Sequence, residues 1–338
     1  MPFLAFNALL MSYETKVEQE IRNYQDVANV NDLPAISHYW SNKYLRPKLE
    51  ALGFKSPNDF FIRYMSHMAR ANPRSTCNIL SLGAGNCDAE AHFAGLLLEA
   101  GISNFVFHCL DINAQMLARG QRLVRKENLT AHFAFIETDI NSWDAPEAAY
   151  NIVIANQSLH HIAELELLFE KTHRCLTDNG FFLTHDMIGR NGHMRWPEAL
   201  EFVQACWTLL DEKHRWNCQL KRHEEVYENW DCSLVGFEGI RSQDILPLLV
   251  KTFHFDCFLG FTNAIGVFID RAFGHNFDES KPEDRYFIDF VSQLDEYFIE
   301  SGKFKPTQMI AAMTKTDRTP TKVYKHLTPE FCTRDPSL

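Results

Sequence analysis

The segment that decides the fold is Leu80-Ser81-Leu82-Gly83-Ala84-Gly85-Asn86-Cys87-Asp88. It starts as an apolar strand, turns at two glycines and leads into the helical stretch 89–100. Glycines let a ligand approach the backbone, and the start of the following helix offers unpaired N–H groups. A dinucleotide-binding loop would have its third glycine at position 88. Asp88 stands there instead, which argues against a dehydrogenase.

Short β-rich segments alternate with helical stretches after residue 77. The expected strands are 78–82, 105–110, 132–137, 150–155 and 180–186, and the expected helices between them are 89–100, 114–125 and 162–176. Strands joined by helices of this length form βαβ units with right-handed crossovers, so an α/β fold with a parallel sheet is predicted.

The composition limits what the chain can bind. Its 338 residues suffice for one elaborated domain or two compact ones, and 27 Phe predict a deep core. A net charge of −11 makes nucleic acid an unsuitable partner, because binding it requires cations against many phosphates. Nine scattered cysteines without a C-x-x-C pair indicate reduced thiols and a cytoplasmic location.

The N-terminal segment 1–11 is apolar but short. It has neither the basic start nor the small-residue cleavage site of a signal peptide, and it is too short to span a bilayer. We therefore expect no membrane partner. Met11 is an alternative start of the chain.

Two acidic residues follow the second and third expected strands. Asp111 ends the second strand, where a carboxylate can accept hydrogen bonds from both hydroxyls of a ribose; the alternative is that it only caps the next helix. Asp139 lies beside Ile140 after the third strand, an arrangement that suits the amino group and ring face of adenine, or is a simple loop acid. The carboxyl ends of parallel strands meet at one edge, so one ligand could contact both acids and the glycine turn.

With these features, residues 75–190 resemble the class I S-adenosylmethionine-dependent methyltransferases. The matching motifs are L-G-A-G at 82–85, Asp111, T-D-I at 138–140 and N-Q-S-L-H-H at 156–161, which resembles the N-x-x-L-H-H form of the fourth motif. Cys87 departs from the third glycine of many members, which leaves the contour of the loop open. The resemblance implies S-adenosylmethionine as the cofactor, with these contacts: Gly83, Ala84, Gly85, Asp111, Ile112, Asp139, Ile140, Asn156, Gln157 and Tyr39. Tyr39 comes from a resemblance in the N-terminal segment, and core packing is its alternative role.

The resemblance also implies the architecture: a seven-stranded, mostly parallel, Rossmann-like sheet whose last strand is antiparallel. Segments 253–261 and 308–316 would be the last two strands. A helix after Ser280 would carry Phe287, Phe290, Leu294 and Phe298 on one face. The expected division is an N-terminal helical cap (1–75), a cofactor-binding core (76–187), a lid or acceptor insertion with the last two strands (188–316) and a polar tail (317–338).

Three residues at the active edge are candidate proton acceptors. His160 and His161 follow the fourth strand, and Asp186 ends the fifth; in sugar-directed methyltransferases with the L-H-H pattern, such groups are the expected bases. Either histidine could instead pack the helix start or contact the cofactor. No H-x-x-x-H pair or acid cluster is present, so no metal ion is predicted.

The acceptor-binding residues are expected in the insertion and beside Asp186. They are His185, Trp196, Glu238 and Arg241, where Arg241 could bind an anionic group or form a salt bridge to Glu238 or Asp244, and Trp196 could roof the pocket or pack the insertion. Segments 188–200 and 237–249 are similar to a subgroup of bacterial methyltransferases from natural-product or surface-glycan pathways.

These features predict transfer of a methyl group from S-adenosylmethionine to a small-molecule acceptor, foremost a hydroxyl oxygen, in natural-product or glycan tailoring. Two alternatives stay open: an N- or carboxyl-directed methyltransferase, and a non-catalytic subunit that binds S-adenosylmethionine. A homodimer is compatible with the sequence.

Overall fold

The computed structural model describes residues 13–24, 33–234 and 236–335. The apolar segment 1–11, with the alternative start Met11, lies outside the described residues.

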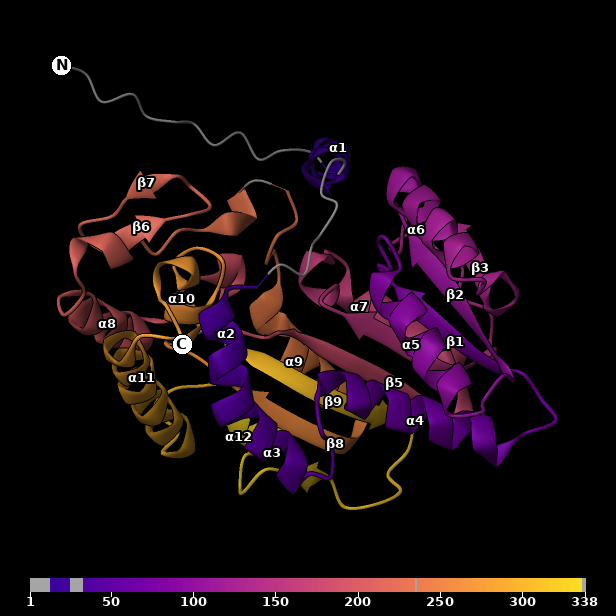
Figure 1. Cartoon of the computed structure of the whole chain (residues 1–338). Helices are drawn as coiled ribbons and strands as arrows, with labels where there is room; N and C mark the ends of the chain where they lie inside the picture. Colours follow the sequence, from indigo (N-terminus) through magenta and orange to yellow (C-terminus); the bar gives the residue numbers. More distant parts are fainter. Residues whose placement is uncertain (1–12, 25–32, 235, 336–338) are drawn as a thin grey trace.

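A sheet of eight strands runs through the molecule in the order β10-β8-β9-β5-β4-β1-β2-β3 (Figure 1). The strands are β1 (Cys77–Leu82), β2 (Phe105–Asp111), β3 (Phe133–Glu137), β4 (Tyr150–Asn156), β5 (Leu176–Met187), β8 (His254–Phe261), β9 (Gln308–Thr314) and β10 (Lys322–Val323). β9 is antiparallel to both its neighbours, β5 and β8, and the other pairings in this sheet are parallel. The Rossmann-like α/β fold is confirmed, although the predicted count of seven strands omitted the short strand β10.

Helices cover both faces of this sheet. They include α4 (Pro57–Ala71), α5 (Asp88–Glu99), α6 (Ala114–Lys126), α7 (Leu165–Cys175) and α9 (Ser242–Thr252). The chain steps from β1 to β2 and β3 in one direction and from β4 to β5 in the other. Right-handed crossovers therefore place α5 and α6 on one face and α7 on the opposite face. α4 contacts α5, and α9 contacts α7, which completes the two helical layers.

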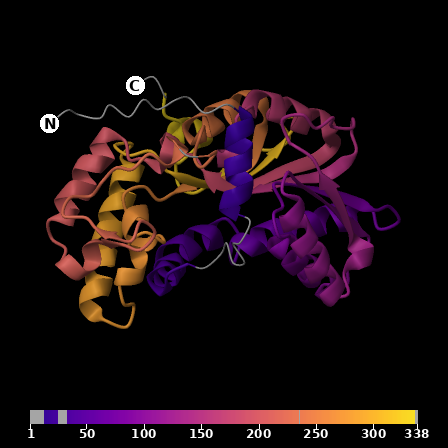
Figure 2. The ribbon, with the colours of Figure 1, turned by 90° about the horizontal axis from the view of Figure 1, so that it is seen from above.

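The N-terminal helices reach across the end of the sheet. They are α1 (Tyr13–Tyr24), α2 (Ala35–Trp40), the π-helical turn η1 (Ser41–Leu45) and α3 (Arg46–Ala51). Seen from above, α1 lies between the insertion on one side and α5 and α6 on the other (Figure 2). The Tyr13 hydroxyl donates to Asp139 Oδ2 at 2.7 Å, and the Asn113 side chain donates to the Ile21 carbonyl at 3.4 Å. These contacts hold α1 over the loops that follow β2 and β3.

Two insertions follow β5 and β8. The first contains α8 (Pro197–Trp207), the hairpin of β6 (Trp216–Asn217) and β7 (Arg222–His223), and the turns η4 (Asn191–His193), η5 (Glu212–Arg215) and η6 (Cys232–Leu234). The second contains α10 (Gly266–Ile269), the turn η7 (Gly274–Asn276) and α11 (Pro282–Glu300). The core itself adds the turns η2 (Thr130–His132) and η3 (Leu159–His161). The predicted helical insertion before the last long strand is thus present.

Helix α11 is turned relative to the expected aromatic face. Its buried residues are Asp284, Ile288, Val291, Ser292, Asp295 and Ile299, whereas Phe290 is 52% exposed. Two buried acids explain the rotation: Asp284 accepts a hydrogen bond from His214, and Asp295 accepts the backbone N–H groups of Asn263 and Ala264. Buried carboxyl groups without these partners would incur the full desolvation penalty, so the two sets of hydrogen bonds favour the observed orientation of the helix.

The segment expected as a polar tail belongs to the folded body. β10 pairs with Cys257 and Phe258 of β8, and the short helix α12 (Pro329–Cys332) contacts α9 and β8. Leu327 and Cys332 are buried. A few apolar residues spaced along a polar segment are enough to fix it to the sheet edge.

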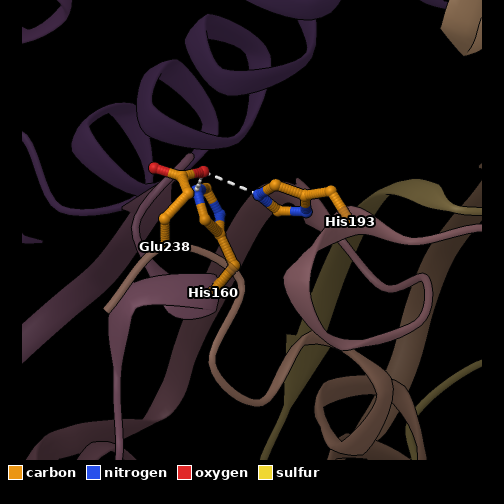
Figure 3. A group of neighbouring side chains, drawn as sticks. All are labelled: His160, His193 and Glu238. Atoms are coloured by element: carbon orange, nitrogen blue, oxygen red, sulfur yellow. Dashed lines mark hydrogen bonds and ion pairs between the residues drawn. The ribbon is translucent and has the colours of Figure 1, made fainter. Parts of the chain in front are cut away.

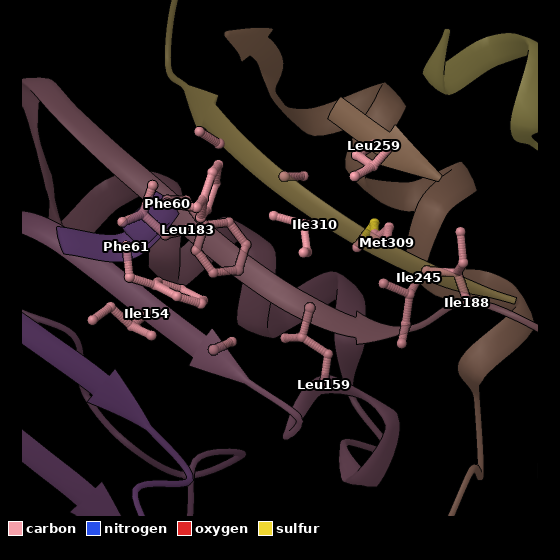
Figure 4. Packing of buried hydrophobic residues seen from close by; sticks show 14 of the residues in the cluster. Phe60, Phe61, Ile154, Leu159, Leu183, Ile188, Ile245, Leu259, Met309 and Ile310 are labelled. Carbon is pink, nitrogen blue, oxygen red and sulfur yellow. The ribbon is translucent and has the colours of Figure 1, made fainter. Parts of the chain in front are cut away.

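The core explains most of the phenylalanines. Most described Phe side chains are buried, and they line the sheet and the helices against it. In Figure 4, Phe60 and Phe61 of α4 pack beside Leu183 of β5 and Ile154 of β4. Because these strands are covered on both faces, the core is continuous and holds the carboxyl ends of β1, β2, β4 and β5 in place.

Candidate functional site

The glycine turn after β1 has the shape that the sequence predicts. Gly83 and Gly85 both have positive φ, at 67° and 52°. A Cβ on Gly83 would lie 2.8 Å from the Cβ of Ser158, and one on Gly85 would lie 3.1 Å from the methyl carbon of Met116. Cys87, at the position of the third glycine, also has positive φ, at 57°. Glycine is therefore required at Gly83 both by conformation and by space.

Asp111 lies at the end of β2, facing this turn. Its Oδ2 accepts the Gly85 N–H at 2.8 Å, and its Oδ1 accepts the Asn113 N–H at 2.8 Å. The capping alternative is wrong, because the side chain of Asn113 accepts the N–H groups of Gln115 and Met116 at the start of α6. Asp111 thus braces the glycine turn, and its carboxylate lies at the edge where a ligand hydroxyl would donate to it.

The loop after β3 presents Asp139 and the buried Ile140. Asp139 Oδ1 accepts hydrogen bonds from the backbone and side chain of Asn141, at 2.8 Å and 2.9 Å. Asp139 Oδ2 accepts from the Tyr13 hydroxyl. Burial and Asp139 raise the pKa of Tyr13, so the hydroxyl keeps its proton and acts as the donor. The structure places Asp139 at the predicted edge and adds α1 as a neighbour that the sequence did not indicate.

The end of β4 turns sharply toward the glycine loop. Asn156 ends the strand, and Gln157 follows with a φ of 56° and donates its N–H to the His185 carbonyl. The next hydroxyl, on Ser158, donates to the Leu82 carbonyl at 2.8 Å. This turn brings the fourth motif against the first and carries the chain into η3, which holds His160 and His161.

Asp186 and His160 form a buried pair. The His160 Nδ1 lies 2.6 Å from Asp186 Oδ1, and Asp186 Oδ2 accepts the N–H groups of Ser158 and Leu159. Although burial opposes its charge, His160 and the surrounding N–H groups hold the pKa of Asp186 below its usual range. Asp186 therefore accepts from Nδ1, and the second nitrogen of His160, Nε2, points outward.

Glu238 lies on the outer side of His160, beside His193 (Figure 3). Its Oε1 is 3.4 Å from His160 Nε2 and 2.6 Å from His193 Nε2, and its Oε2 is 3.6 Å from His161 Nε2. The Glu238 side chain is 33% exposed, which opens the cluster to the exterior. Two carboxylates and three imidazoles thus meet at the carboxyl ends of β4 and β5.

The charges in this cluster alternate. Burial would lower the pKa of His160, but Asp186 and Glu238 raise it, so His160 carries a proton. Burial also opposes the charge of Glu238, yet hydrogen bonds from His160 and His193 hold its pKa well below the usual range. Burial lowers the pKa of His193 despite its bond to Glu238, so that imidazole is neutral.

Four residues predicted to contact the cofactor or the acceptor have other partners in the structure. Tyr39 donates to Asp289 of α11, and Arg241 pairs with Glu166 and Asp244. Trp196 is buried with the guanidinium groups of Arg190 and Arg334 against its ring. Side chains alternate along a strand, so His185 points to the opposite face from Asp186 and packs against Phe261. The structure does not bring these four to the cluster, and packing or salt-bridge roles account for them.

Two residues of the site were missed by the sequence reasoning. His193 comes from the insertion, after Gly192 with a φ of 65°, and Tyr13 comes from α1. Neither residue has a characteristic spacing to the motif residues, so no sequence signal could have found them without the fold.

Comparison with known proteins agrees with this geometry. A family model described as a methyltransferase domain matches residues 80–182, which span β1 to β5 with the glycine turn, Asp111 and the His160 segment. The chain carries a class I S-adenosylmethionine-dependent methyltransferase domain. S-adenosylmethionine is the cofactor of this methyltransferase domain.

Two curated relatives are much longer proteins. The chain is 25% identical over 221 residues to Fusarielin synthase FSL1 of Gibberella zeae, which covers 64% of this chain and 8% of that protein. It is 25% identical over 195 residues to the highly reducing polyketide synthase acrA of Aspergillus aculeatus, covering 56% of this chain and 8% of that protein. The chain therefore spans a small part of the length of either relative.

Solved structures with a similar arrangement include two enzymes. The geranyl diphosphate C-methyltransferase of Streptomyces coelicolor A3(2) has 10% identity and a TM-score of 0.45, covering 89% of this chain and 98% of that chain. The [4+2]-cyclase SpnF has 15% identity and a TM-score of 0.41, covering 76% of this chain and 81% of that chain.

Within the described part of the chain, every helix is too short or too polar to cross a bilayer.

The residues of the methyltransferase domain fit the cofactor. A Cβ would fill the cradle at Gly83, and Asp111 presents a carboxylate beside it. Ala84 and Gly85 complete the turn, Ile112 follows Asp111, and Asp139 with Ile140 ends the adjacent loop, which is the edge where open α/β sheets bind their ligands. Bound there, S-adenosylmethionine supplies an electrophilic methyl group. The individual contacts of these residues, with Asn156 and Gln157, stay predictions.

Proposed function

We propose that this protein transfers the methyl group of S-adenosylmethionine to a small-molecule acceptor whose proton is removed at the His160 cluster, foremost a hydroxyl oxygen. The observation that carries the proposal is the Asp186–His160 pair at the carboxyl ends of β4 and β5, with Nε2 facing Glu238. A carboxylate that holds Nδ1–H fixes the tautomer of the ring and stabilises its imidazolium form. His160 takes the proton of the acceptor from its neutral form, after Nε2 has released the proton that it carries beside Glu238. Proton removal from a positioned hydroxyl contributes about 10²–10⁴-fold to a rate.

The acceptor side is formed by Glu238 and His193 from the insertion. Their hydrogen bond of 2.6 Å joins two segments of the first insertion. The Gly192 N–H donates to the Gly239 carbonyl between the same two segments, and the Ile240 N–H donates to the His160 carbonyl, which joins the insertion to the edge of the sheet. We infer that the insertion, the segment expected as a lid, positions the acceptor against the methyl group.

A carbon acceptor is the second candidate. One relative is a polyketide synthase, as its name states. A carbon acid next to a carbonyl needs both a base and a donor for the enolate oxygen, and the cluster offers two imidazoles on one carboxylate. The matched acceptors for the test are therefore phenols and sugar hydroxyls on one side and β-ketoacyl thioesters on the other.

The test combines cofactor binding with turnover. We expect the wild-type chain to bind S-adenosylmethionine by calorimetry and to release S-adenosylhomocysteine with one of these acceptor classes. His160→Ala and Asp186→Asn should lose about 10²–10⁴-fold in turnover and retain cofactor affinity. His92→Ala, a change at an exposed histidine of α5, is the matched control.

Several outcomes would contradict the proposal. Full activity in both His160→Ala and Asp186→Asn would exclude base assistance at this cluster. Cofactor binding without turnover on any acceptor would favour the non-catalytic subunit. Mass and NMR analysis of the product separates methylation at oxygen, nitrogen, carboxyl and carbon.

A further inference from the structure

Three side chains from separate segments converge at the acceptor side of the site. His160 comes from η3, His193 from η4, and Glu238 from the loop before α9 (Figure 3). One ligand atom of each, a ring nitrogen of either histidine and a Glu238 carboxylate oxygen, lies within 4.8 Å of the other two. The Glu238 carboxylate stands between the two imidazoles, so all three could bind one central atom.

One of the distances between the ligand atoms already matches the coordination sphere of a small divalent ion. Ligand atoms about 2.0–2.1 Å from a tetrahedral ion lie about 3.3–3.5 Å from one another. His160 Nε2 and Glu238 Oε1 are 3.4 Å apart. His193 Nε2 lies closer to Glu238 Oε1, at 2.6 Å, because it donates a hydrogen bond there. An ion would replace that bridging proton with a displacement of less than about one ångström.

The surroundings of His160 favour metal binding as well. Metal-ligating histidines usually donate their other ring N–H to a carboxylate, which fixes the tautomer and orients the ring. Asp186 does this for His160 at 2.6 Å, and backbone N–H groups of Ser158, Leu159 and Met187 hold Asp186 in turn. This support is complete before any ion binds, so His160 already presents Nε2 outward, and an ion would displace the proton that Nε2 carries.

We propose that His160, His193 and Glu238 bind a divalent transition-metal ion, foremost Zn²⁺. Two imidazoles and one carboxylate form the ligand set that three-ligand zinc sites use, with at least one coordination position left for water or an acceptor oxygen. The donor set disfavours Mg²⁺ and Ca²⁺, which prefer oxygen ligands. The site deepens the proposed function and rests on it for its role: an ion here would replace His160 Nε2 as the group that activates the acceptor, because it would bind the acceptor oxygen and lower the pKa of its proton.

Metal binding by the full-length chain tests the site directly. After dialysis against a chelator, Zn²⁺ binding is measured by competition with a chromophoric chelator, and Co²⁺ binding by its visible absorption. We expect one equivalent of either ion and the strong absorption bands of a low-coordinate Co²⁺ site. Zn²⁺ should also raise the melting temperature, because it binds the folded chain.

Variants separate a metal site from a hydrogen-bonded cluster. His193→Ala and Glu238→Gln should lose the Co²⁺ bands, and Asp186→Asn should weaken Zn²⁺ binding by about 10–100-fold. His92→Ala should bind as the wild type does, and melting curves without metal confirm that each variant is folded. Absence of stoichiometric binding in the wild type, or unchanged binding in both His193→Ala and Glu238→Gln, would overturn the proposal.

Metal binding and methyl transfer can fail independently, and the two measurements separate them. If the chain binds no ion but still releases S-adenosylhomocysteine with an acceptor after chelation, the metal site is wrong and methyl transfer stands. If it binds the ion at these residues but turns over no acceptor, the metal site stands and the proposed function fails.

Discussion

The cofactor side and the acceptor side of this site are built in opposite ways. On the cofactor side, Gly83, Asp111 and Asp139 follow three consecutive parallel strands, so each lies at the same sheet edge by topology alone. On the acceptor side, His160, His193 and Glu238 come from one core turn and two places in an insertion. Motifs at strand ends can therefore be placed at one site from the sequence alone. The side chains of an insertion can be assigned to a site only when its fold is known.

The largest test of this comparison exchanges one carboxylate on each side. Glu238→Gln should lower turnover by about 10²–10⁴-fold with little change in the affinity for S-adenosylmethionine, because it alters only the proton-accepting cluster. Asp111→Asn should weaken cofactor binding by roughly 1.5–3 kcal/mol, the range for hydrogen bonds to a charged group. Calorimetry measures the cofactor affinity of both variants, and an activity assay measures their turnover. If either variant changed both quantities alike, the cofactor side and the acceptor side would not be separate.

The second prediction concerns a buried carboxyl group under the cofactor side. Burial raises the pKa of Glu90 to about 7, even though the Ser81 hydroxyl donates to it at 2.6 Å. Because the folded chain binds this proton more tightly than the unfolded chain, its contribution to stability is complete below about pH 4.5. The contribution is lost as the pH rises to about 7, and it amounts to about 3 kcal/mol.

Glu90→Gln should remove that pH dependence. Denaturant unfolding between pH 4.5 and 7.5 measures it, and Glu99→Gln, at an exposed position of the same helix, is the control. If the unfolding free energy depended on pH identically in the wild type and Glu90→Gln, the assignment would be contradicted. The cofactor side would then lack this buried proton.

The third prediction separates conformational strain from close approach in the glycine turn. Gly83→Ala and Gly101→Ala both place an alanine at positive φ, at 67° and 73°. That conformation costs roughly 1–2 kcal/mol in either variant. Only Gly83→Ala adds a contact at 2.8 Å to Ser158, whereas nothing lies within 4 Å of a Cβ at Gly101.

We therefore expect Gly83→Ala to be less stable than Gly101→Ala by about 1–2 kcal/mol, the range for overpacking. Gly83→Ala should also weaken cofactor binding, as thermal melting and calorimetry would show. Equal losses of stability in the two variants would mean that the turn moves freely away from Ser158.

The smallest effect concerns the helix that touches both sides. The Tyr13 hydroxyl bonds Asp139 on the cofactor side, and its ring lies 5.5 Å from that of Phe237, next to Glu238. Tyr13→Phe should lower the free energy of local opening of α1 by about 1 kcal/mol, because one hydrogen bond is lost. Amide hydrogen exchange in α1 should then be about fivefold faster. Tyr297→Phe, at a 65% exposed tyrosine of α11, should leave that exchange unchanged. If amide exchange in α1 is unchanged in Tyr13→Phe, the hydrogen bond to Asp139 does not hold α1 over the site.

The sequence predicted the sheet well for the same reason that it could propose residues for the cofactor side. Buried strands appear as apolar runs, and each helix between them has a clear periodic face, so β1 to β5 and the helices α5 to α7 lie where expected. Asn113 shows the limit of this reasoning at the level of one residue. The capping alternative gave that role to Asp111, whereas the structure assigns it to Asn113 and leaves Asp111 for the glycine turn.

The insertion and the C-terminal segment were harder to predict because their positions depend on long-range polar contacts. In α11, Asp284 and Asp295 turn inward to bind His214 and the backbone after β8, and Phe290 turns outward. Arg241 pairs with Asp244, as one alternative held, and also with Glu166, from a helix far away in the sequence. Partners of this kind leave no periodic signal in a single sequence.

The sequence by itself determined the α/β class, the glycine turn, Asp111 and the position of the histidine pair, because each depends on local periodicity and on the rule that strand ends share an edge. The tertiary structure alone decided that Asp186 holds His160, that Glu238 and His193 close its outer side, and that α1 covers the edge. Hydrogen bonds between distant segments have no fixed spacing along the chain. They form only after burial of the apolar strands and helices has brought those segments together.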